Sequence, residues 1–312
     1  MLPADHQPTR QRAPWWKELL IVAAFYGVYS FSRNQFGSDN LIANAEPVAS
    51  FDNAVRVIRW EKAVGLFREH TIQHWFLGWH WFLRFWNVYY GSAHFVVTIV
   101  AFVWLYLRSP ERFPRWRNAL AFTTALAIVG FSFFPLMPPR LLDDSGRFGG
   151  ARLAHEQQVP DYGFVDTLKR DGGLWNFDSG PMTRLSNQYA AMPSLHTAWA
   201  MWCSIVMWPL ARRRWARALI VLYPLATVFC IIITGNHYWI DGLAGLATLA
   251  VGTTIGHGLD RWNRRRRASA AELATDAAPA PAGTSAPAAT PSAATEPATE
   301  PSVTARDIVT LP

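Results

Sequence analysis

Residues 193–241 decide the fold; they read PSLHTAWAMWCSIVMWPLARRRWARALIVLYPLATVFCIIITGNHYWID. Two apolar runs, 195–211 and 215–235, are separated only by a short turn rich in Arg. A third apolar run, 239–259, follows directly. Because a membrane-spanning helix needs about 20 mostly apolar residues, the stretch predicts three antiparallel spans in immediate succession.

Three further apolar runs lie upstream, at 18–35, 82–107 and 118–136. Hydrophobic residues make up 51% of the 312 residues and charged residues only 16%, which is too apolar for an ordinary soluble domain. This composition excludes a simple cytosolic enzyme. The six runs together predict an all-α integral membrane protein, a bundle of six transmembrane helices.

Two long polar stretches separate the predicted spans, at 36–80 and 137–193. Within the first, residues 51–80 mix charges with apolar side chains at helical spacing, which predicts an amphipathic helix at the membrane interface. The apolar positions with this spacing are Val57, Trp60, Val64 and Phe67. The second stretch is rich in Gly, Asp and Pro and predicts a loop that covers the end of the bundle.

Clusters of Arg lie on one side of this arrangement only. The long stretch 36–80 has four positive and five negative residues, and 137–193 has six and seven. Since cytoplasmic loops carry an excess of Lys and Arg, both termini are predicted in the cytoplasm of an inner (plasma) membrane protein, with both long stretches outside. The clustered cations are Arg10, Arg12, Lys17, Arg108, Arg112, Arg115, Arg117, Arg212, Arg213, Arg214, Arg217, Arg261, Arg264, Arg265, Arg266 and Arg267. They account for the net charge of +7, so no nucleic-acid partner is predicted.

Three polar residues are predicted to converge at the outer end of the bundle. His196 begins the fourth span, and His237 and Asp241 begin the sixth. The histidines are 41 residues apart, and two helices of about 20 residues return the chain to the level that it left. His237 and Asp241 are four residues apart and share a helical face, so the carboxylate can hold one ring nitrogen.

This pattern is typical of histidine-mediated group transfer, in which one imidazole attacks phosphorus and the other protonates the leaving oxygen. The charge that develops on the phosphoryl oxygens needs cationic or amide donors. Arg140, just after the third span, and Ser194, at a helix N-terminus, are the predicted phosphate-binding residues. No metal and no other cofactor is predicted.

At these residues the sequence resembles the type 2 phosphatidic acid phosphatase superfamily, which also includes vanadium haloperoxidases. The second motif of the superfamily, P-S-x-H, is complete at 193–196, and the H-x-x-x-D of the third is complete at 237–241. The resemblance implies a six-helix core, with His237 as the nucleophile that forms a phosphohistidine, Asp241 as its orienting residue and His196 as the general acid.

Two departures from the phosphatase motifs indicate a branch of the superfamily. The first motif, K-x6-R-P, is absent, and P-P-R ending at Arg140 occupies its place. The positions that usually hold Ser and Arg in the third motif are Cys230 and Ile231. The remaining pattern, A-A-M-P-S-L-H with H-Y-x-x-D, is more similar to the branch of inositol phosphorylceramide synthases and sphingomyelin synthases, which are lipid head-group transferases.

Residues just before the second motif are further candidates. Arg184, Asn187 and Tyr189 are predicted either to line the site or to support the loop. The glycines Gly252 and Gly256 form a G-x-x-x-G pattern that predicts close helix packing without chemistry.

Several other histidines have two interpretations. His70, His74 and His80 belong to the predicted interfacial helix; the alternative is a metal site in a membrane oxidase. His94 and Asn87 in the second span are expected to face the bundle interior, where they contact either substrate or a neighbouring helix.

The chain is therefore divided into a cytoplasmic segment 1–17, a six-span catalytic domain 18–260 and a cytoplasmic tail 261–312. The tail is first basic, and from 268 to 312 it has 33 Ala, Pro, Ser or Thr among 45 residues, which predicts disorder.

The predicted function is that of an inositolphosphotransferase-like enzyme, which moves a phosphorus-containing head group between membrane lipids at the outer membrane face. Its expected partners are a phospholipid or isoprenoid phosphate substrate and a lipid alcohol acceptor. The alternatives are a lipid phosphate phosphatase and a non-enzymatic transporter or lipid-binding protein. The sequence predicts no oligomeric state.

Overall fold

The computed structural model describes residues 45–174 and 188–276, with Pro14, Trp16, Leu20 and Gly27 as isolated positions. The first predicted span and the candidates Arg184 and Asn187 lie outside the two described ranges. The chain divides into two compact units, Met1–Arg266 and Arg267–Pro312. The first unit holds the helices discussed below; in the second, the described residues 267–276 are helical.

All elements of the described residues are helices, and the prediction of an all-α protein is confirmed for this part of the chain. One isolated bridge pairs Leu136 with Ala190. In chain order the helices are α2 (Ala45–Ala63), α3 (Glu69–Phe76), α4 (His80–Arg108), α5 (Phe113–Phe133), α6 (Pro139–Leu142), α7 (Ala151–Glu156), α8 (Thr167–Asp171), α10 (Leu195–Met207), the 3-10 helix η1 (Trp208–Leu210), α11 (Arg214–Ile233) and α12 (Trp239–Asp276).

Three of the described helices are long and apolar enough to cross a membrane: His80–Arg108, Arg214–Ile233 and Trp239–Leu273. The predicted run 118–136 is also helical, as α5. The run 195–211 is divided between the 13 residues of α10 and the three of η1. At 1.5 Å per residue α10 is only about 20 Å long, so six full crossings stay a prediction.

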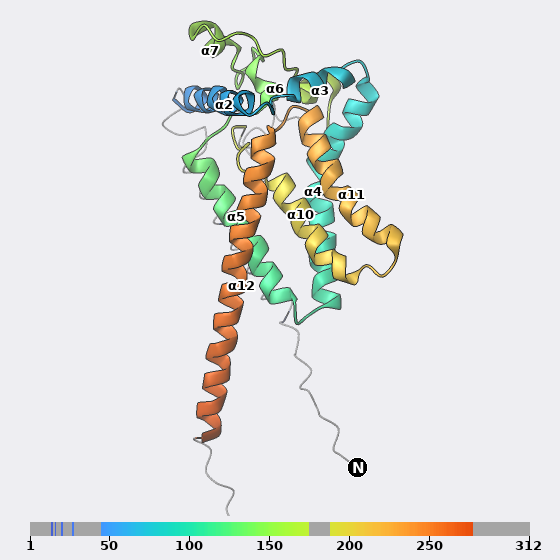
Figure 1. The fold of residues 1–312 in the computed structure, drawn as a ribbon, viewed down its shortest axis with the longest axis vertical. Coiled ribbons are helices and arrows are strands. Elements are labelled where there is room, and N and C mark those ends of the chain that lie inside the picture. Colours follow the sequence, from blue (N-terminus) through green and yellow to red (C-terminus); the bar gives the residue numbers. More distant parts are fainter. Residues whose placement is uncertain are drawn as a thin grey trace, which may run out of the picture. The chain divides into compact units, whose positions relative to one another are not determined.

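Helices α4, α5, α10, α11 and α12 run side by side (Figure 1). Within this bundle, α10 packs against α4, α5 and α11. The side chain of Trp202 is fully buried at the centre of this packing and donates to the backbone oxygen of Trp116 on α5 at 3.0 Å. A bundle of this kind fixes the first turn of α10, where His196 lies, against its neighbours.

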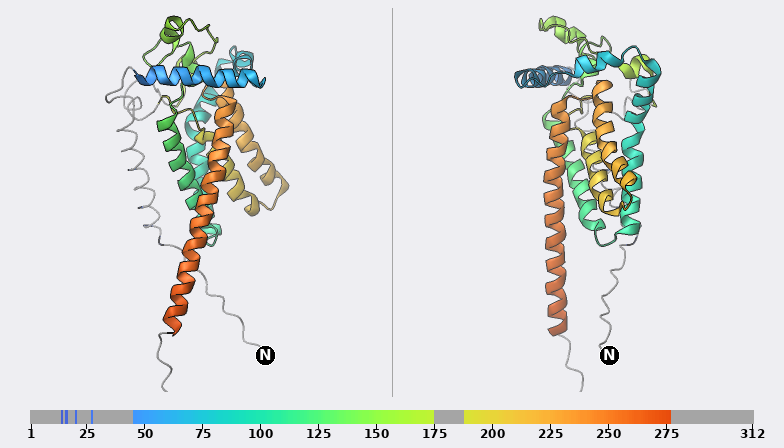
Figure 2. Two further views of the ribbon diagram at one scale, coloured as in Figure 1. Left: turned by 60° about the vertical axis from the view of Figure 1, so that its left-hand side comes forward. Right: turned by 45° about the vertical axis from the view of Figure 1, so that its right-hand side comes forward.

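Helices α2 and α3 lie across one end of this bundle (Figure 2). The sequence predicted one amphipathic helix over 51–80, but the structure has two, because the chain turns at Gly65. Its φ of +73° is readily adopted only by glycine. The inner face of α2 buries Phe51, Ala54 and Ile58 against residues that follow α5.

Glycines of α12 let it approach its neighbours closely, as the sequence predicted. A Cβ atom added at Gly252 would lie 2.6 Å from the backbone nitrogen of Thr123 on α5, and one at Gly256 would lie 2.5 Å from that of Ala119. A Cβ at Gly245 would collide with the carbonyl oxygen of Ser194. The start of α10 is therefore pressed directly against α12.

Helix α12 also extends beyond its predicted end. Residues 260–276 continue the helix, and residues 268–276, the first part of the segment predicted to be disordered, are helical in the structure. Arg and Ala in this segment favour helix, and Arg264 Nε donates to Asp260 Oδ2 at 2.8 Å, one helical turn away. The rest of the predicted tail, 277–312, lies outside the described residues.

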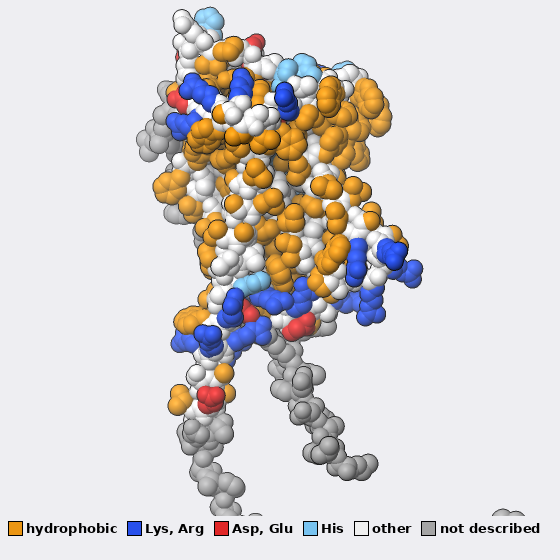
Figure 3. Space-filling view, viewed as in Figure 1, with side chains coloured by type: hydrophobic (Ala, Val, Ile, Leu, Met, Phe, Trp, Pro, Cys, Tyr) orange, Lys and Arg blue, Asp and Glu red, His pale blue; other side chains and the backbone are white. Residues whose placement is uncertain are grey.

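The surface of the bundle is apolar between its two ends (Figure 3). Exposed apolar side chains cover α4 and α11, among them Phe95, Ile99, Leu222 and Leu225. Lys and Arg gather in a band at the end remote from α2, where the α10–α11 turn lies. Large exposed apolar surfaces indicate contact with another apolar phase, which fits helices in a membrane.

Candidate active site

His237 lies in the tight turn between α11 and α12. The turn contains Gly235, whose φ is +66°, and the backbone N–H groups of Asn236 and His237 both donate to Ile231 O, at 3.0 and 3.2 Å. The residue is only 3% exposed. The imidazole is thereby fixed at the N-terminal end of α12 and largely excluded from solvent.

Asp241 holds the His237 ring from the first turn of α12. Its Oδ2 atom lies 3.3 Å from His237 Nδ1 and accepts the backbone N–H of Tyr238 at 2.9 Å. Asp241 is fully buried. If Nδ1 donates to this carboxylate, Nε2 of His237 keeps its lone pair, which is the state that a nucleophile requires.

The third predicted residue, His196, lies beside them at the start of α10. Its Nδ1 atom is 3.4 Å from His237 Nε2. If the Nε2 lone pair of His237 accepts this hydrogen bond, the donor is the N–H at Nδ1 of His196. The structure thus brings together the three residues that the sequence spacing predicted, in the order Asp241, His237, His196.

Two residues of α4 surround His196. The ring of Tyr90 stacks on it, with centroids 4.3 Å apart, and that of His94 meets it edge-on at the same distance. The buried Nε2 atom of His196 has no hydrogen-bond partner among the described residues. Sequence reasoning left His94 open and missed Tyr90, although their spacing of four on one helix was a usable signal.

Ser194 has a structural contact that the sequence did not predict. Its hydroxyl oxygen accepts the backbone N–H of Thr197 at 3.4 Å and so caps α10. Its own backbone N–H donates to Asp241 O at 2.9 Å. Ser194 therefore ties the helix of His196 to the helix of Asp241, and its predicted contact with phosphate stays a prediction.

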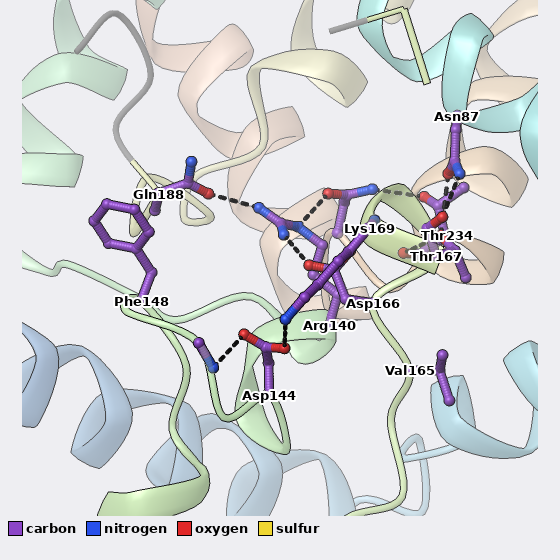
Figure 4. A network of polar contacts seen from close by, with 12 residues as sticks. Asn87, Arg140, Asp144, Phe148, Val165, Asp166, Thr167, Lys169, Gln188 and Thr234 are labelled. Atoms are coloured by element: carbon purple, nitrogen blue, oxygen red, sulfur yellow. Dashed lines mark hydrogen bonds and ion pairs between the residues drawn. The ribbon is translucent and has the colours of Figure 1, made fainter. Parts of the chain in front are cut away.

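Arg140 lies next to the turn that holds His237. Its backbone N–H donates to Gly235 O at 2.7 Å and its Nε to Asn236 Oδ1 at 3.1 Å. The guanidinium also donates to Asp166 Oδ2 at 2.6 Å and to Gln188 Oε1 at 2.7 Å (Figure 4). The sequence predicted that Arg140 lies at the same end of the bundle as the histidines. It did not predict the partners Asp166 and Gln188, because both belong to the irregular stretch 137–193.

Asp166 belongs to a segment, 162–172, that side chains from the helices hold in place; we call it the strap. Gln73 of α3 donates to Val165 O and accepts from Val165 N, both at 3.0 Å. Asn87 of α4 donates to Thr167 O at 2.8 Å. The strap therefore presents Asp166 to Arg140 in a defined position. Asn87, which the sequence left between a contact with substrate and one with a neighbouring helix, binds this segment.

Tyr189 is not brought to the histidines. It is 1% exposed, packs in the apolar cluster beneath α2 and donates to Phe148 O at 3.2 Å. The preceding residue, Gln188, reaches Arg140 instead. The contacts of Tyr189 therefore favour a role in supporting the loop over one in lining the site.

The histidines of the first polar stretch, His70, His74 and His80, do not converge on one point. The rings of His70 and His74 are 4.1 Å apart, and His74 Nε2 lies 2.8 Å from Gly163 O. His80 instead pairs with Asp171 at 2.6 Å. Within 45–174 and 188–276, no three His, Cys, Asp or Glu side chains are arranged to share a metal ion.

A family model described as the PAP2 superfamily matches residues 55–255. The chain belongs to the PAP2 superfamily. The match extends from α2 into α12 and includes Arg140, His196, His237 and Asp241. No curated protein and no solved structure matches the chain significantly.

Members of the PAP2 superfamily include lipid phosphatases and phosphotransferases. The chain is accordingly an enzyme that acts on lipid phosphates in a membrane, and a non-enzymatic transporter or lipid-binding protein is no longer the alternative.

Proposed function

We propose that this PAP2-superfamily enzyme is a membrane lipid phosphotransferase that moves a phosphorus-containing head group between lipids through a phosphohistidine. The observation that carries the proposal is the continuous row Asp241, His237, His196, with separations of 3.3 and 3.4 Å. If Nδ1 of His237 donates to Asp241, the Nε2 lone pair of His237 is available for nucleophilic attack.

In the first step, the lone pair of His237 Nε2 forms a bond to phosphorus while the bond from phosphorus to the leaving oxygen breaks. His196, protonated on both ring nitrogens when substrate is bound, gives its Nδ1 proton to that oxygen and becomes neutral. Asp241 stabilises the positive charge that develops on His237. The substrate phosphorus must enter between two nitrogens now 3.4 Å apart, so substrate binding requires the rings to separate.

In the second step, the hydroxyl of an acceptor attacks phosphorus, the bond to His237 Nε2 breaks, and the acceptor proton passes to His196 Nδ1. A lipid alcohol as acceptor gives a new phospholipid, whereas water gives a phosphatase reaction. Cys230 and Ile231, at the positions that hold Ser and Arg in the phosphatases, are both buried in α11. Neither side chain carries the positive charge that the Arg at this position supplies in the phosphatases. The absence of that charge favours the transferase.

Arg140 is the proposed cation for the phosphoryl oxygens, because it lies beside the turn of His237 and is only 5% exposed. A buried guanidinium stabilises developing negative charge far more than one in water. The start of α12, which carries the site, is hydrogen-bonded to α2 and α3 at one end of the bundle, and the Arg-rich band lies at the other end (Figure 3). The positive-inside rule then supports an extracytoplasmic site beneath α2 and α3 at the membrane surface.

The test supplies purified protein in detergent with phosphorus-labelled phospholipids, with and without a lipid alcohol. We expect labelled lipid product only with the alcohol, and label bound to the wild-type protein but not to His237→Ala. Both His237→Ala and His196→Ala should lose at least about 10³-fold in turnover.

Each outcome of this assay has a definite meaning. Phosphate released without alcohol would replace the transferase by a phosphatase with the same nucleophile. Wild-type turnover in His237→Ala would overturn the mechanism for both reactions.

A further inference from the structure

Three carboxyl groups converge on the start of α12. The first backbone N–H groups of a helix have no partner within the helix, and here three consecutive ones are bound by carboxylate oxygens. Tyr238 N donates to Asp241 at 2.9 Å, Trp239 N to Glu69 Oε1 at 3.1 Å, and Ile240 N to Glu61 Oε1 at 2.9 Å.

The two glutamates come from the helices that cross the end of the bundle. Glu61 is in the last turn of α2 and Glu69 is the first residue of α3. Both are fully buried. Lys62, the neighbour of Glu61 in α2, lies over the ring of Phe67 at 5.1 Å.

The two carboxyl groups differ in how many hydrogen bonds they accept. Glu69 uses both oxygens, since Oε2 also accepts the backbone N–H of Arg68 at 2.9 Å. Glu61 uses only Oε1; its buried Oε2 has no hydrogen-bond partner among the described residues. Both oxygens of Glu69 accept a backbone N–H, which suits an ionised carboxylate. Only one oxygen of Glu61 accepts, which a neutral carboxylic acid can also do.

The surrounding charges favour the same assignment. The titratable side chains that face Glu61 are Glu69 from α3 and, from the start of α12, Asp241 and Tyr238. Burial, and then the neighbouring Glu69 carboxyl, raises the pKa of Glu61 to about 9. Glu61 is therefore protonated at neutral pH.

We propose that Glu61, as a neutral acid, and Glu69, as a carboxylate, are positioning residues that hold the first turn of α12 and thereby the His237–Asp241 pair. This inference rests on the proposed function of that pair. It makes α2 and α3 supports of the turn that holds His237 rather than only a cover over the bundle.

The matched variants are Glu61→Gln and Glu69→Gln. Glutamine keeps the one acceptor that Glu61 uses, so Glu61→Gln should retain turnover within about threefold. At position 69 it replaces one of two acceptor oxygens by an NH₂ group facing the backbone N–H of Arg68. Glu69→Gln should therefore lower kcat roughly 10- to 100-fold with little change in KM, as expected for a displaced catalytic group.

The pH dependence provides a second readout. Wild-type turnover should fall above pH about 9, where Glu61 ionises, and Glu61→Gln should lack this decrease. Equal losses in the two variants, or an unchanged alkaline decrease in Glu61→Gln, would overturn the proposal.

Thermal unfolding in detergent tests the proposal without any substrate. Between the ordinary pKa of Glu61, 4.5, and its raised value of about 9, the folded protein holds a proton that the unfolded chain has lost. Stability must therefore decrease as pH rises through this window. Glu61→Gln should remove that dependence, and Glu156→Gln, on an exposed helix, should retain it.

The unfolding result separates the two proposals. A reduced pH dependence in Glu61→Gln together with no turnover on any lipid would reject the phosphotransferase reaction but keep the assignment of Glu61 as a neutral acid. A pH dependence identical to that of wild type would reject the assignment even if the enzyme transfers head groups.

Discussion

The Nδ1 side of the His237 imidazole is held by Asp241. Asp241 fixes its Nδ1 proton, and without that contact the ring can place the proton on Nε2, where no lone pair would then remain for phosphorus. Orientation of this kind has a large effect on rate although Asp241 does not touch the substrate.

Asp241→Asn should accordingly lower kcat by on the order of 10³- to 10⁴-fold, the scale seen when the carboxylate that orients a catalytic histidine is replaced by an amide. The protein should still fold, because the amide oxygen can accept the N–H of Tyr238. Asp260→Asn, in the same helix near the Arg-rich end, serves as the control and should retain wild-type turnover. Equal rates in the two variants would contradict the orienting role.

The sequence indicated some of these residues and not others for a physical reason. His237 and Asp241 are one helical turn apart, and His196 is one helical hairpin away, so regular geometry alone brings them together. Asp166 and Gln188 reach Arg140 from an irregular loop whose path depends on Gln73 and similar contacts. No periodicity in the sequence encodes such contacts.

Among the helices, the contact between α12 and α5 depends on the absence of side chains. Gly252→Ala would place a Cβ atom 2.6 Å from the backbone nitrogen of Thr123, and a backbone atom cannot move aside as a flexible side chain can. We expect a loss of about 1–3 kcal/mol in unfolding free energy, measured by thermal or denaturant unfolding in detergent.

Gly258→Ala is the matched control for that change. It lies in the same helix, is exposed, and a Cβ there meets nothing within 4 Å. Since alanine favours helix over glycine by roughly 1 kcal/mol, this variant should be as stable as wild type or slightly more stable. Destabilisation of both variants to the same extent would show that the helix contact is not the cause.

The boundaries of elements were predicted less well than their existence. The run 82–107 is found as α4 almost to the residue, because apolar composition continues to its ends. The break between α2 and α3 was missed, because the apolar pattern continues across Gly65 and only the backbone conformation there divides the helix.

At the scale of the whole molecule, the Arg-rich band and the site lie at opposite ends of the first unit. Cysteine labelling in intact cells tests the orientation that follows. Glu156→Cys, at the exposed end of α7, should react with a membrane-impermeant maleimide, and Arg213→Cys, in the α10–α11 turn, should react only after permeabilisation. Wild type is the control, since Cys203 and Cys230 are buried. The reverse labelling pattern would place the site in the cytoplasm.

The strap and the histidines belong to different stretches of chain. His196, His237 and Asp241 all lie within 194–241, whereas Asp166 and Arg140 come from the preceding loop. The row of reacting side chains and the proposed phosphate-binding cation are thereby encoded in separate stretches. A graft of 194–241 alone would carry the histidines and Asp241 but leave Arg140 and Asp166 behind, so a protein engineer who moves this site to another scaffold has to move both stretches.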